Sequence, residues 1–213
     1  MNKRIVLIGG GGHAQVLLEI MEQTGLEPYA YLSPHKSISN TTLFDDMYHW
    51  DSDDEMLKLL PDDYILVNAI GSMPGECLRS KLGAKFSAAG FEFMTLISPM
   101  ATVSKYAKLG SGVQILPSAV IQSGCSIGHN CIINTAAIIE HDSDIGERCH
   151  IAPGAVLCGG VSLGENVHIG SNATVIQNIK ISRDSIIGAG VTINKDIENS
   201  SIIYPARPHI RRL

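Results

Sequence analysis

A histidine between two carboxylates, in the run Glu140-His141-Asp142, is the part of the sequence best suited to proton transfer. An imidazole titrates near neutrality, so it can accept a proton, and an adjacent carboxylate can orient the ring and stabilise its charged form. We therefore expect His141 to act as a general base, with Asp142 or Glu140 as its partner. The alternative is that both carboxylates are solvated surface groups.

Two further histidines, His150 and His168, are eighteen residues apart. In a fold that repeats every eighteen residues they would lie one above the other, which could suggest a metal site. Zinc sites need three or four protein ligands, and no third ligand occurs at a matching spacing, so we expect no metal. The five cysteines include no Cys-x-x-Cys pair for zinc. Their number is odd, and Cys125, Cys131 and Cys149 are predicted to be small core residues, which indicates a reducing compartment, the cytoplasm.

The elements that position these histidines follow from a repeat of six residues. An aliphatic side chain occupies every sixth position from Val103 to Ile193, sixteen times in succession, and a small or aliphatic side chain stands four places after each of them. A period of six fits neither an α-helix nor a flat strand and is the signature of a hexapeptide β-helix. Both series then point inward, and His141, two places after Ile139, points outward.

Glycine fixes the length of one coil of this β-helix. It follows the aliphatic residue at four positions eighteen apart: Gly110, Gly128, Gly146 and Gly164. Three hexads therefore make one coil, and the coils stack into a triangular prism. We expect these glycines to form a column at one corner, where they would adopt positive φ. No helix is expected between Leu109 and Ile187.

The first 97 residues follow a different pattern, in which apolar strands alternate with amphipathic helices. The expected elements are a strand over Arg4–Gly9, a helix that ends near Thr24, strands over Glu27–Leu32 and Tyr64–Ile70, and a helix over Leu78–Ala89. Strand, glycine turn, helix and strand make a βαβ unit. The sequence therefore predicts an α/β, Rossmann-like nucleotide-binding domain over residues 1–97 and a parallel β-helix with a C-terminal tail over residues 98–213.

Four glycines and a histidine, from Gly9 to His13, follow the first strand. Such a turn presents backbone N–H groups and a helix N-terminus, which bind phosphate. An NAD-binding domain also needs an acidic residue at the end of the second strand, where this chain has Ser33 and Pro34. We therefore expect a nucleotide sugar or another phosphorylated ligand. We expect His13 to contact that ligand rather than to cap the helix or fill the core.

Charge and hydropathy exclude other partners. The formal net charge is −5 over 213 residues, which argues against nucleic acid. The apolar runs are too short for a membrane span, and the start MNKRIVLIGGGG resembles a signal peptide only superficially because glycines end the apolar run.

Beyond these patterns, the chain resembles the bacterial nucleotide-sugar acetyltransferases with hexapeptide repeats, of the UDP-4-amino-sugar N-acetyltransferase and sialic acid O-acetyltransferase type. Five segments carry the resemblance: GGGGHA at Gly9–Ala14, AIG at Ala69–Gly71, LISPMATVS at Leu96–Ser104, INTAAIIEHDSDIGERCHIAPGA at Ile133–Ala155 and YPAR at Tyr204–Arg207. The resemblance implies a left-handed β-helix and a homotrimer with active sites between adjacent prisms. It also implies acetyl-CoA as a co-substrate, with no permanently bound cofactor, and a nucleotide-linked amino sugar held by the N-terminal domain.

The resemblance further implies roles for single residues, with Asp142 as the favoured partner of His141. His150 and Asn134 would lie near the acetyl group, where a hydrogen-bond donor polarises the thioester carbonyl. Three small residues would leave the backbone open to the pantetheine arm of acetyl-CoA: Gly159, Gly188 and Ala189. Six residues would contact the nucleotide sugar: Gly10, Gly11, Gly12, His13, Ser33 and Gly71.

These implications predict an acetyl-CoA-dependent N-acetyltransferase that acts on the amine of a nucleotide-linked amino sugar in bacterial cell-surface glycan biosynthesis. Direct transfer is favoured over an acetyl-cysteine on Cys158, which has no basic neighbour in sequence. The alternative is a sugar O-acetyltransferase of the sialic acid type, which would depend more on His141 because a hydroxyl is the weaker nucleophile. From other classes come a non-catalytic β-helix scaffold and a γ-carbonic-anhydrase-like metal enzyme, and the latter needs three zinc histidines.

Overall fold

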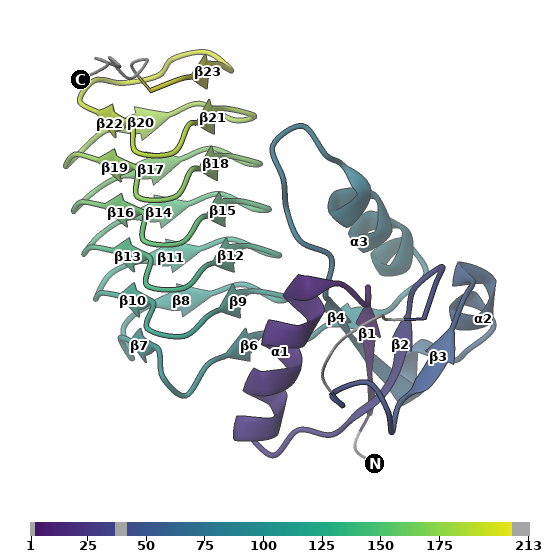
Figure 1. Cartoon of the computed structure of the whole chain (residues 1–213). Helices are drawn as coiled ribbons and strands as arrows, with labels where there is room; N and C mark the ends of the chain where they lie inside the picture. The colour runs from purple at the N-terminus through teal and green to yellow at the C-terminus, as the bar shows by residue number, and fades with distance from the viewer. Residues whose placement is uncertain (1–2, 37–41, 206–213) are drawn as a thin grey trace, which may run out of the picture.

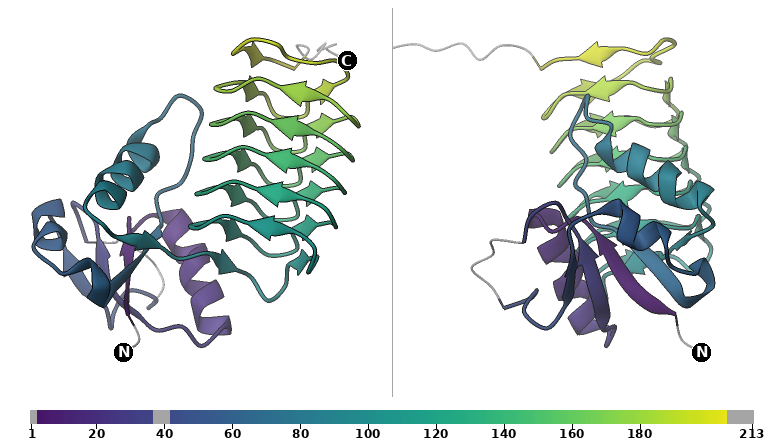
Figure 2. Two further views of the ribbon diagram at one scale, coloured as in Figure 1. Left: turned by 180° about the vertical axis from the view of Figure 1, so that it is seen from behind. Right: turned by 90° about the vertical axis from the view of Figure 1, so that its right-hand side faces the viewer.

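The computed structural model describes residues 3–36 and 42–205. It shows two parts side by side, a layered α/β domain and a tall prism of stacked coils (Figure 1). The views in Figure 2 show the α/β domain next to the lower coils of the prism. Among the described residues, no helix is long and apolar enough to cross a membrane.

A five-stranded parallel sheet, in the order β3-β2-β1-β4-β5, forms the middle layer of the α/β domain. Its strands are β1 (Arg4–Ile8), β2 (Pro28–Leu32), β3 (Tyr48–Trp50), β4 (Tyr64–Asn68) and β5 (Glu92–Phe93). The helices are α1 (Gly12–Gln23), α2 (Asp53–Leu57) and α3 (Leu78–Ala88), with a short 3₁₀ turn at Pro61–Asp63. This arrangement is the predicted Rossmann-like one, with β3 and α2 as elements that the sequence pattern did not indicate.

The two faces of this sheet have separate cores. On one face, α1 buries Leu17 and Met21 together with Leu116 and Ile132 of the prism. On the other face, Phe86 of α3 packs with a second apolar cluster. Because burial of apolar side chains is the main stabilising term, the shared cluster under α1 fixes the α/β domain against the prism.

Three parallel sheets form the sides of the prism, and each strand is two residues long. The seven-stranded sheet contains β6 (Leu96–Ile97), β9 (Gln114–Ile115), β12 (Ile132–Ile133), β15 (His150–Ile151), β18 (His168–Ile169), β21 (Ile186–Ile187) and β23 (Ile202–Ile203). The six-stranded sheet contains β7 (Thr102–Val103), β10 (Val120–Ile121), β13 (Ile138–Ile139), β16 (Val156–Leu157), β19 (Thr174–Val175) and β22 (Thr192–Ile193). The five-stranded prism sheet contains β8 (Lys108–Leu109), β11 (Ser126–Ile127), β14 (Asp144–Ile145), β17 (Ser162–Leu163) and β20 (Lys180–Ile181).

The register of these strands confirms the coil of eighteen residues. Ile121 pairs with Ile139, and Ile139 pairs with Leu157 one coil further on. The aliphatic series and the small series form one continuous buried cluster inside the prism, partly open only at its ends. No helix occurs between Leu109 and Ile187 in this described stretch. The predicted fold class, a Rossmann-like domain followed by a left-handed β-helix, is therefore confirmed.

The glycine column has a different physical reason from the one expected. None of the four glycines at this corner is among the described residues with positive φ, so that expectation was wrong. A Cβ on Gly128 would lie 2.6 Å from the backbone nitrogen of Glu147, in the coil above. Successive coils therefore approach too closely at this corner for any side chain. The left-handed conformation occurs two residues later instead, for example at Gly112 and Asn130.

The boundary between residues 97 and 98 stays a prediction. The strand β6 already pairs with β9 of the prism, so the chain enters the seven-stranded sheet directly after β5. At the other end, β23 pairs with β21 and adds a last strand to that sheet. Ala206 and Arg207 of the YPAR segment lie outside the described residues, as does the rest of the tail to Leu213.

Candidate active site

His141 lies at the corner between the six-stranded sheet and the five-stranded prism sheet, and it points outward as predicted. Its Nδ1 is 2.9 Å from Oδ2 of Asp142. The carboxylate accepts only, so Nδ1 carries the hydrogen, and Nε2 of the neutral ring keeps its lone pair. The side chain of His141 is 63% exposed and that of Asp142 is 74% exposed. The ring is thus oriented by Asp142, with a basic nitrogen free to accept a proton.

The imidazole ring of His141 packs against the backbone of the coil above. A Cβ on Gly159 would lie 2.6 Å from Nε2 and 2.7 Å from Cε1 of His141, so the ring rests directly on the glycine backbone. The next residue, Gly160, donates its N–H to the carbonyl of His141 at 2.9 Å. A hollow of about 310 Å³ opens here, lined by His141, Asp142, Gly159, Gly160, Gln177 and Asn178.

Glu140, the other predicted partner, is held differently. Its carbonyl accepts a hydrogen bond from Oγ of Ser143 at 2.8 Å. Its carboxylate forms no hydrogen bond or ion pair with any residue that the structure describes. Asp142 is therefore the carboxylate that contacts the imidazole. The catalytic roles of all three residues stay predictions.

His150 and Asn134 form a pair at a different side of the prism, beneath the α/β domain. Nδ1 of His150 donates to the carbonyl of Ser72 at 3.1 Å, so Nε2 accepts from Nδ2 of Asn134 at 3.0 Å. Burial first, and then the neighbouring His168, lower the pKa of His150 to about 3. The ring is therefore neutral and both of its nitrogens are in use. The second N–H of Asn134 is the donor that this pair leaves for a ligand.

The stacking of His150 and His168 is as the sequence suggested, with ring centroids 4.9 Å apart and nearly perpendicular planes. Within the described residues, no group of three or more His, Cys, Asp or Glu side chains is arranged to hold a metal ion.

The residues expected along the pantetheine arm do not lie together. Gly159 shares a corner with His141, whereas Gly188 and Ala189 lie at the corner between the seven- and six-stranded sheets. A Cβ on Gly188 would meet the carbonyl oxygen of Ile203 at 2.9 Å, so the C-terminal segment covers this glycine. Ala189 is exposed. Contact of one acetyl-CoA molecule with both corners would require a path across the six-stranded sheet or two copies of the chain.

The glycine turn leaves the start of α1 open. Gly11 is the N-cap, with no side-chain hydrogen bond and no acidic residue in the first turn. A Cβ on Gly11 or Gly12 would meet no atom within 4 Å. A Cβ on Gly10 would lie 3.4 Å from Cβ of Ser33, so the turn and the end of β2 adjoin as predicted. The positive end of the helix dipole at Gly11 and Gly12 therefore faces open space, with no acidic side chain in the first turn of α1.

His13 connects the two domains. Its Nε2 donates to Oε1 of Gln114 at 2.8 Å. A Cβ on Gly71 would lie 3.8 Å from the Cβ of His13. Burial is the main cause that lowers the pKa of His13 to about 4, and the Gln114 contact only partly opposes it. The side chain neither caps α1 nor joins the apolar core. Contact with a ligand stays a prediction.

Gln114 was missed by the sequence reasoning, although a signal was present. Its Nε2 donates to the carbonyl of Asn68 at 2.8 Å, and its Oε1 also accepts from Nη2 of Arg79 at 3.3 Å. The residue stands at the outward position of its hexad, in the column that also contains His150 and His168. A polar side chain there marks the face covered by another domain.

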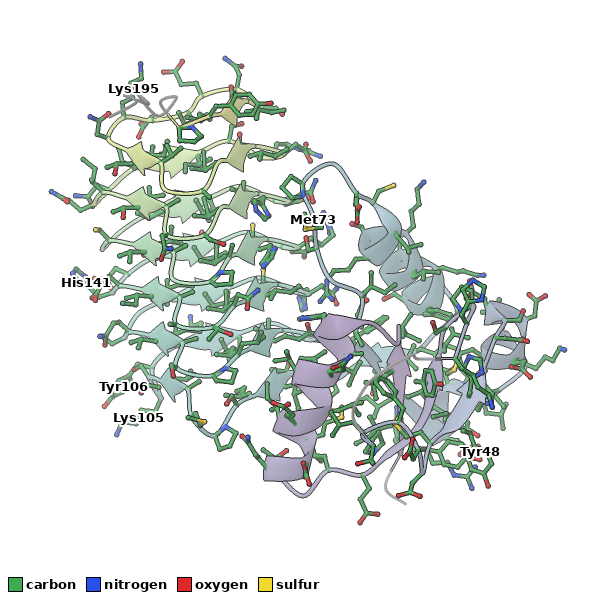
Figure 3. All side chains as sticks on the ribbon, in the orientation of Figure 1. Tyr48, Met73, Lys105, Tyr106, His141 and Lys195 are labelled. Carbon is green, nitrogen blue, oxygen red and sulfur yellow. The ribbon has the colours of Figure 1, made fainter. Side chains whose placement is uncertain are left out.

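Figure 3 shows His141 at the edge of the prism that is turned away from the α/β domain. His13 and the glycine turn lie on the opposite side, against the seven-stranded sheet. A single chain therefore separates the expected base from the expected nucleotide-sugar contacts.

The prism of hexapeptide coils and the Rossmann-like domain joined to it both match family models, and these place the chain in the class of hexapeptide-repeat transferases. Residues 4–74 match the PglD N-terminal domain. Residues 106–137 and 160–195 match the bacterial transferase hexapeptide (six repeats), and residues 136–176 match the hexapeptide repeat of succinyl-transferase.

Individual similar proteins indicate a narrower family within this class. PerB from Caulobacter crescentus, in complex with CoA and GDP-perosamine, is 33% identical with a TM-score of 0.81, over 95% of this chain and 94% of that one. The acetyltransferase domain of PglB from Neisseria gonorrhoeae FA1090, in complex with acetyl coenzyme A, is 29% identical with a TM-score of 0.83, over 98% and 100%. UDP-N-acetylbacillosamine N-acetyltransferase from Bacillus subtilis (strain 168) is 34% identical over 119 residues, which are 54% of this chain and about half, 51%, of that protein.

The chain belongs to the family of bacterial nucleotide-sugar acetyltransferases with a PglD-type N-terminal domain and hexapeptide repeats. The predicted family and the predicted enzyme class, an acetyltransferase, are confirmed.

Proposed function

We propose that the protein transfers the acetyl group of acetyl-CoA to the amine of a nucleotide-linked amino sugar, in bacterial cell-surface glycan biosynthesis. The orientation of His141 carries this proposal, because Asp142 holds Nδ1 at 2.9 Å and leaves Nε2 at the mouth of an open hollow. Relatives described with CoA, acetyl-CoA and GDP-perosamine support the choice of both substrates.

The reaction begins when the amine nitrogen attacks the carbonyl carbon of the thioester. Nε2 of His141 accepts the proton that the nitrogen loses, and the carboxylate of Asp142 stabilises the imidazolium that forms. The tetrahedral intermediate then breaks its C–S bond, and His141 returns the proton to the departing sulfur of CoA. In the homotrimer proposed below, the second N–H of Asn134 from a neighbouring copy would stabilise the oxyanion of this intermediate.

The nucleotide sugar is held at the glycine turn in this proposal. Gly11 and Gly12 offer their N–H groups and the start of α1 to the diphosphate, because no side chain occupies that space. Gly10 and Ser33 border the same turn, and His13 with Gly71 lies on its prism side. Direct contacts of these residues with the sugar nucleotide are part of the proposal.

A homotrimer would bring the separated parts of the site together. The outward column of the six-stranded sheet carries no charge: Thr102, Val120, Ile138, Val156, Thr174 and Thr192. The outward column of the five-stranded prism sheet is polar and charged: Lys108, Ser126, Asp144, Ser162 and Lys180. We therefore propose that the six-stranded sheet packs near other copies, and His141 at its edge then faces a neighbour.

The assembly can be tested directly by sedimentation velocity. The chain mass of 22.8 kDa predicts a trimer close to three times that value. A fully active monomer would overturn the shared site. The proposed location is the cytoplasm, supported by five cysteines that are all free thiols.

A substrate screen tests the reaction itself. UDP-, dTDP- and GDP-linked amino sugars are offered separately with acetyl-CoA, and free thiol is measured while mass spectrometry identifies the product. Acetylation of one amino sugar, absent when its amine is replaced by a hydroxyl, supports N-acetylation. Acetylation of a sugar hydroxyl with no turnover of any amine would favour the O-acetyltransferase. The His141→Ala variant is the matched control for thiol that is released by background hydrolysis of the thioester rather than by acetyl transfer.

A further inference from the structure

A second cavity, here called the α3 cavity, lies between the segment from Ser72 to Ser87 and the corner of the prism that leads into the seven-stranded sheet. Its volume is about 600 Å³, within the range of sites for small molecules. Figure 3 labels Met73 on the loop that forms one rim. Of the residues proposed above for acetyl transfer, only His150 lines it.

The wall of the α3 cavity contains a buried cation. Arg79 is 9% exposed, and its Nη1 donates to the carbonyls of Asn68 and Ile70, both at 2.6 Å. Nη2 donates to Oε1 of Gln114 at 3.3 Å. All three acceptors are neutral, and the guanidinium forms no ion pair within the described part of the chain. Burial lowers the pKa of Arg79 to about 10, so the group is charged at neutral pH.

These hydrogen bonds leave part of the guanidinium unused. The group has five N–H donors, and three of them are engaged. The remaining two are on Nε and Nη2, adjacent nitrogens of one plane. A phosphate or a carboxylate offers two oxygens to such a pair, and the charge of either anion would offset the cost of the buried cation.

The other charges around the α3 cavity are compensated or exposed. Arg148 pairs with Glu147 and Glu165 at 2.8 and 2.6 Å. Asp184 accepts from Arg183 at 3.0 Å, and Glu76 is on the exposed rim. The uncompensated buried charge in this wall is therefore positive.

We propose that the α3 cavity binds a small organic anion, whose phosphate or carboxylate group contacts Arg79. The rings of His129 and His168 line the opposite wall and offer polar contacts to the rest of the molecule. This site is separate from the glycine turn, because none of the turn residues lines the cavity.

Two variants separate the site from the fold. Ala84 is exposed on α3 and lines the cavity, so Ala84→Trp fills it without removing a hydrogen bond. Arg79→Gln removes the cation. Lys81→Gln removes a charge from the exposed side of the same helix and is the matched control, since Lys81 does not line the cavity. Gly11→Val blocks the other phosphate site, the glycine turn.

Isothermal titration calorimetry with inorganic phosphate and with malonate, at constant ionic strength, tests the proposal. We expect saturable binding of one probe to the whole protein, unchanged in Lys81→Gln. In Gly11→Val, binding at the α3 cavity should persist, and only a component at the glycine turn should be lost. Arg79→Gln should weaken binding at the α3 cavity by about tenfold or more, because a charge-assisted contact is lost. Ala84→Trp should weaken it at least as much, because the indole occupies the space of the anion. A response to phosphate alone identifies a phosphorylated ligand, and a response to malonate alone identifies a carboxylate.

Two results would overturn the proposal. One is the absence of saturable binding of either probe. The other is binding that Gly11→Val abolishes and Ala84→Trp leaves intact, because the anion would then occupy the glycine turn. Circular dichroism confirms folding of each variant. If Arg79→Gln does not fold, Ala84→Trp still decides the outcome.

Discussion

Replacement of Gly159 by alanine should remove activity without unfolding the protein. The new Cβ would lie 2.6 Å from Nε2 of His141, whereas nonbonded heavy atoms prefer about 3.5 Å. The imidazole must therefore move by roughly 1 Å. It is 63% exposed and free to swing outward, so the displacement costs little folding free energy. An error of about 1 Å in a catalytic group lowers the rate by about 10²-fold, which is the expected loss in kcat.

The assay follows release of free CoA thiol at saturating substrate, and thermal unfolding is monitored in parallel. Gly83→Ala in α3 is the matched control, because its Cβ would make an ordinary 3.5 Å contact with Nδ2 of Asn68. The Gly159→Ala variant should keep a Tm near that of the native protein. In a His141→Ala background, the Gly159 substitution should cause no further loss, since its whole effect passes through the ring.

Two outcomes would refute this reasoning. Native kcat in Gly159→Ala would show that the observed position of the ring is not needed for the reaction. A further large loss in the double variant would show that Gly159 acts through something else, such as the path of the pantetheine arm.

Three other predictions address the base, the nucleotide site and the domain contact. His141→Ala should lower kcat by about 10² to 10⁴ while acetyl-CoA still binds, and Asp142→Asn should cost less; near-native turnover of His141→Ala would exclude it as the base. Gly11→Val should raise KM for the nucleotide sugar with little change for acetyl-CoA, and equal damage to both would point to misfolding. The pKa of His13 is about 4 when folded against 6.5 when unfolded, so its stability contribution is complete above pH 6.5 and declines as pH falls toward 4. The free energy of unfolding, measured with urea at several pH values between 4 and 6.5, should therefore rise with pH less steeply in His13→Gln than in the native protein, by about 1.4 kcal/mol per pH unit. The same pH dependence in both proteins would contradict a neutral His13 in the folded state.

The prism was predictable because its period is local. Each inward position repeats after six residues, so the sequence alone places Ile139 inside and His141 outside, as the structure has them. The choice between Asp142 and Glu140 was not fixed by the period, since both are outward neighbours of the ring. It depends on the corner geometry, in which Asp142 adopts a positive φ of 59° and turns its carboxylate toward Nδ1.

The contacts between the domains could not be predicted in the same way. His13 and Gln114 are 101 residues apart, and nothing in the hexad pattern states which outward column another domain will cover. The burial of His150 has the same origin, because its ring bonds to Ser72 of the α/β domain as well as to Asn134. The signal that would have found this face is a set of three polar side chains, Gln114, His150 and His168, in a column whose other members are aliphatic.

The equal length of the coils, eighteen residues each, has an evolutionary consequence. Insertion or deletion of one complete coil of eighteen residues preserves every inward position and every corner, so the fold can change length without repacking its interior. Such an event between Gln114 and His141 would shift the base by about 4.8 Å along the prism relative to the glycine turn. Lineages can thus adapt the reach between the two halves of the site to longer or shorter acceptors in fixed increments, and insertions of six or twelve residues would instead rotate His141 to a different face.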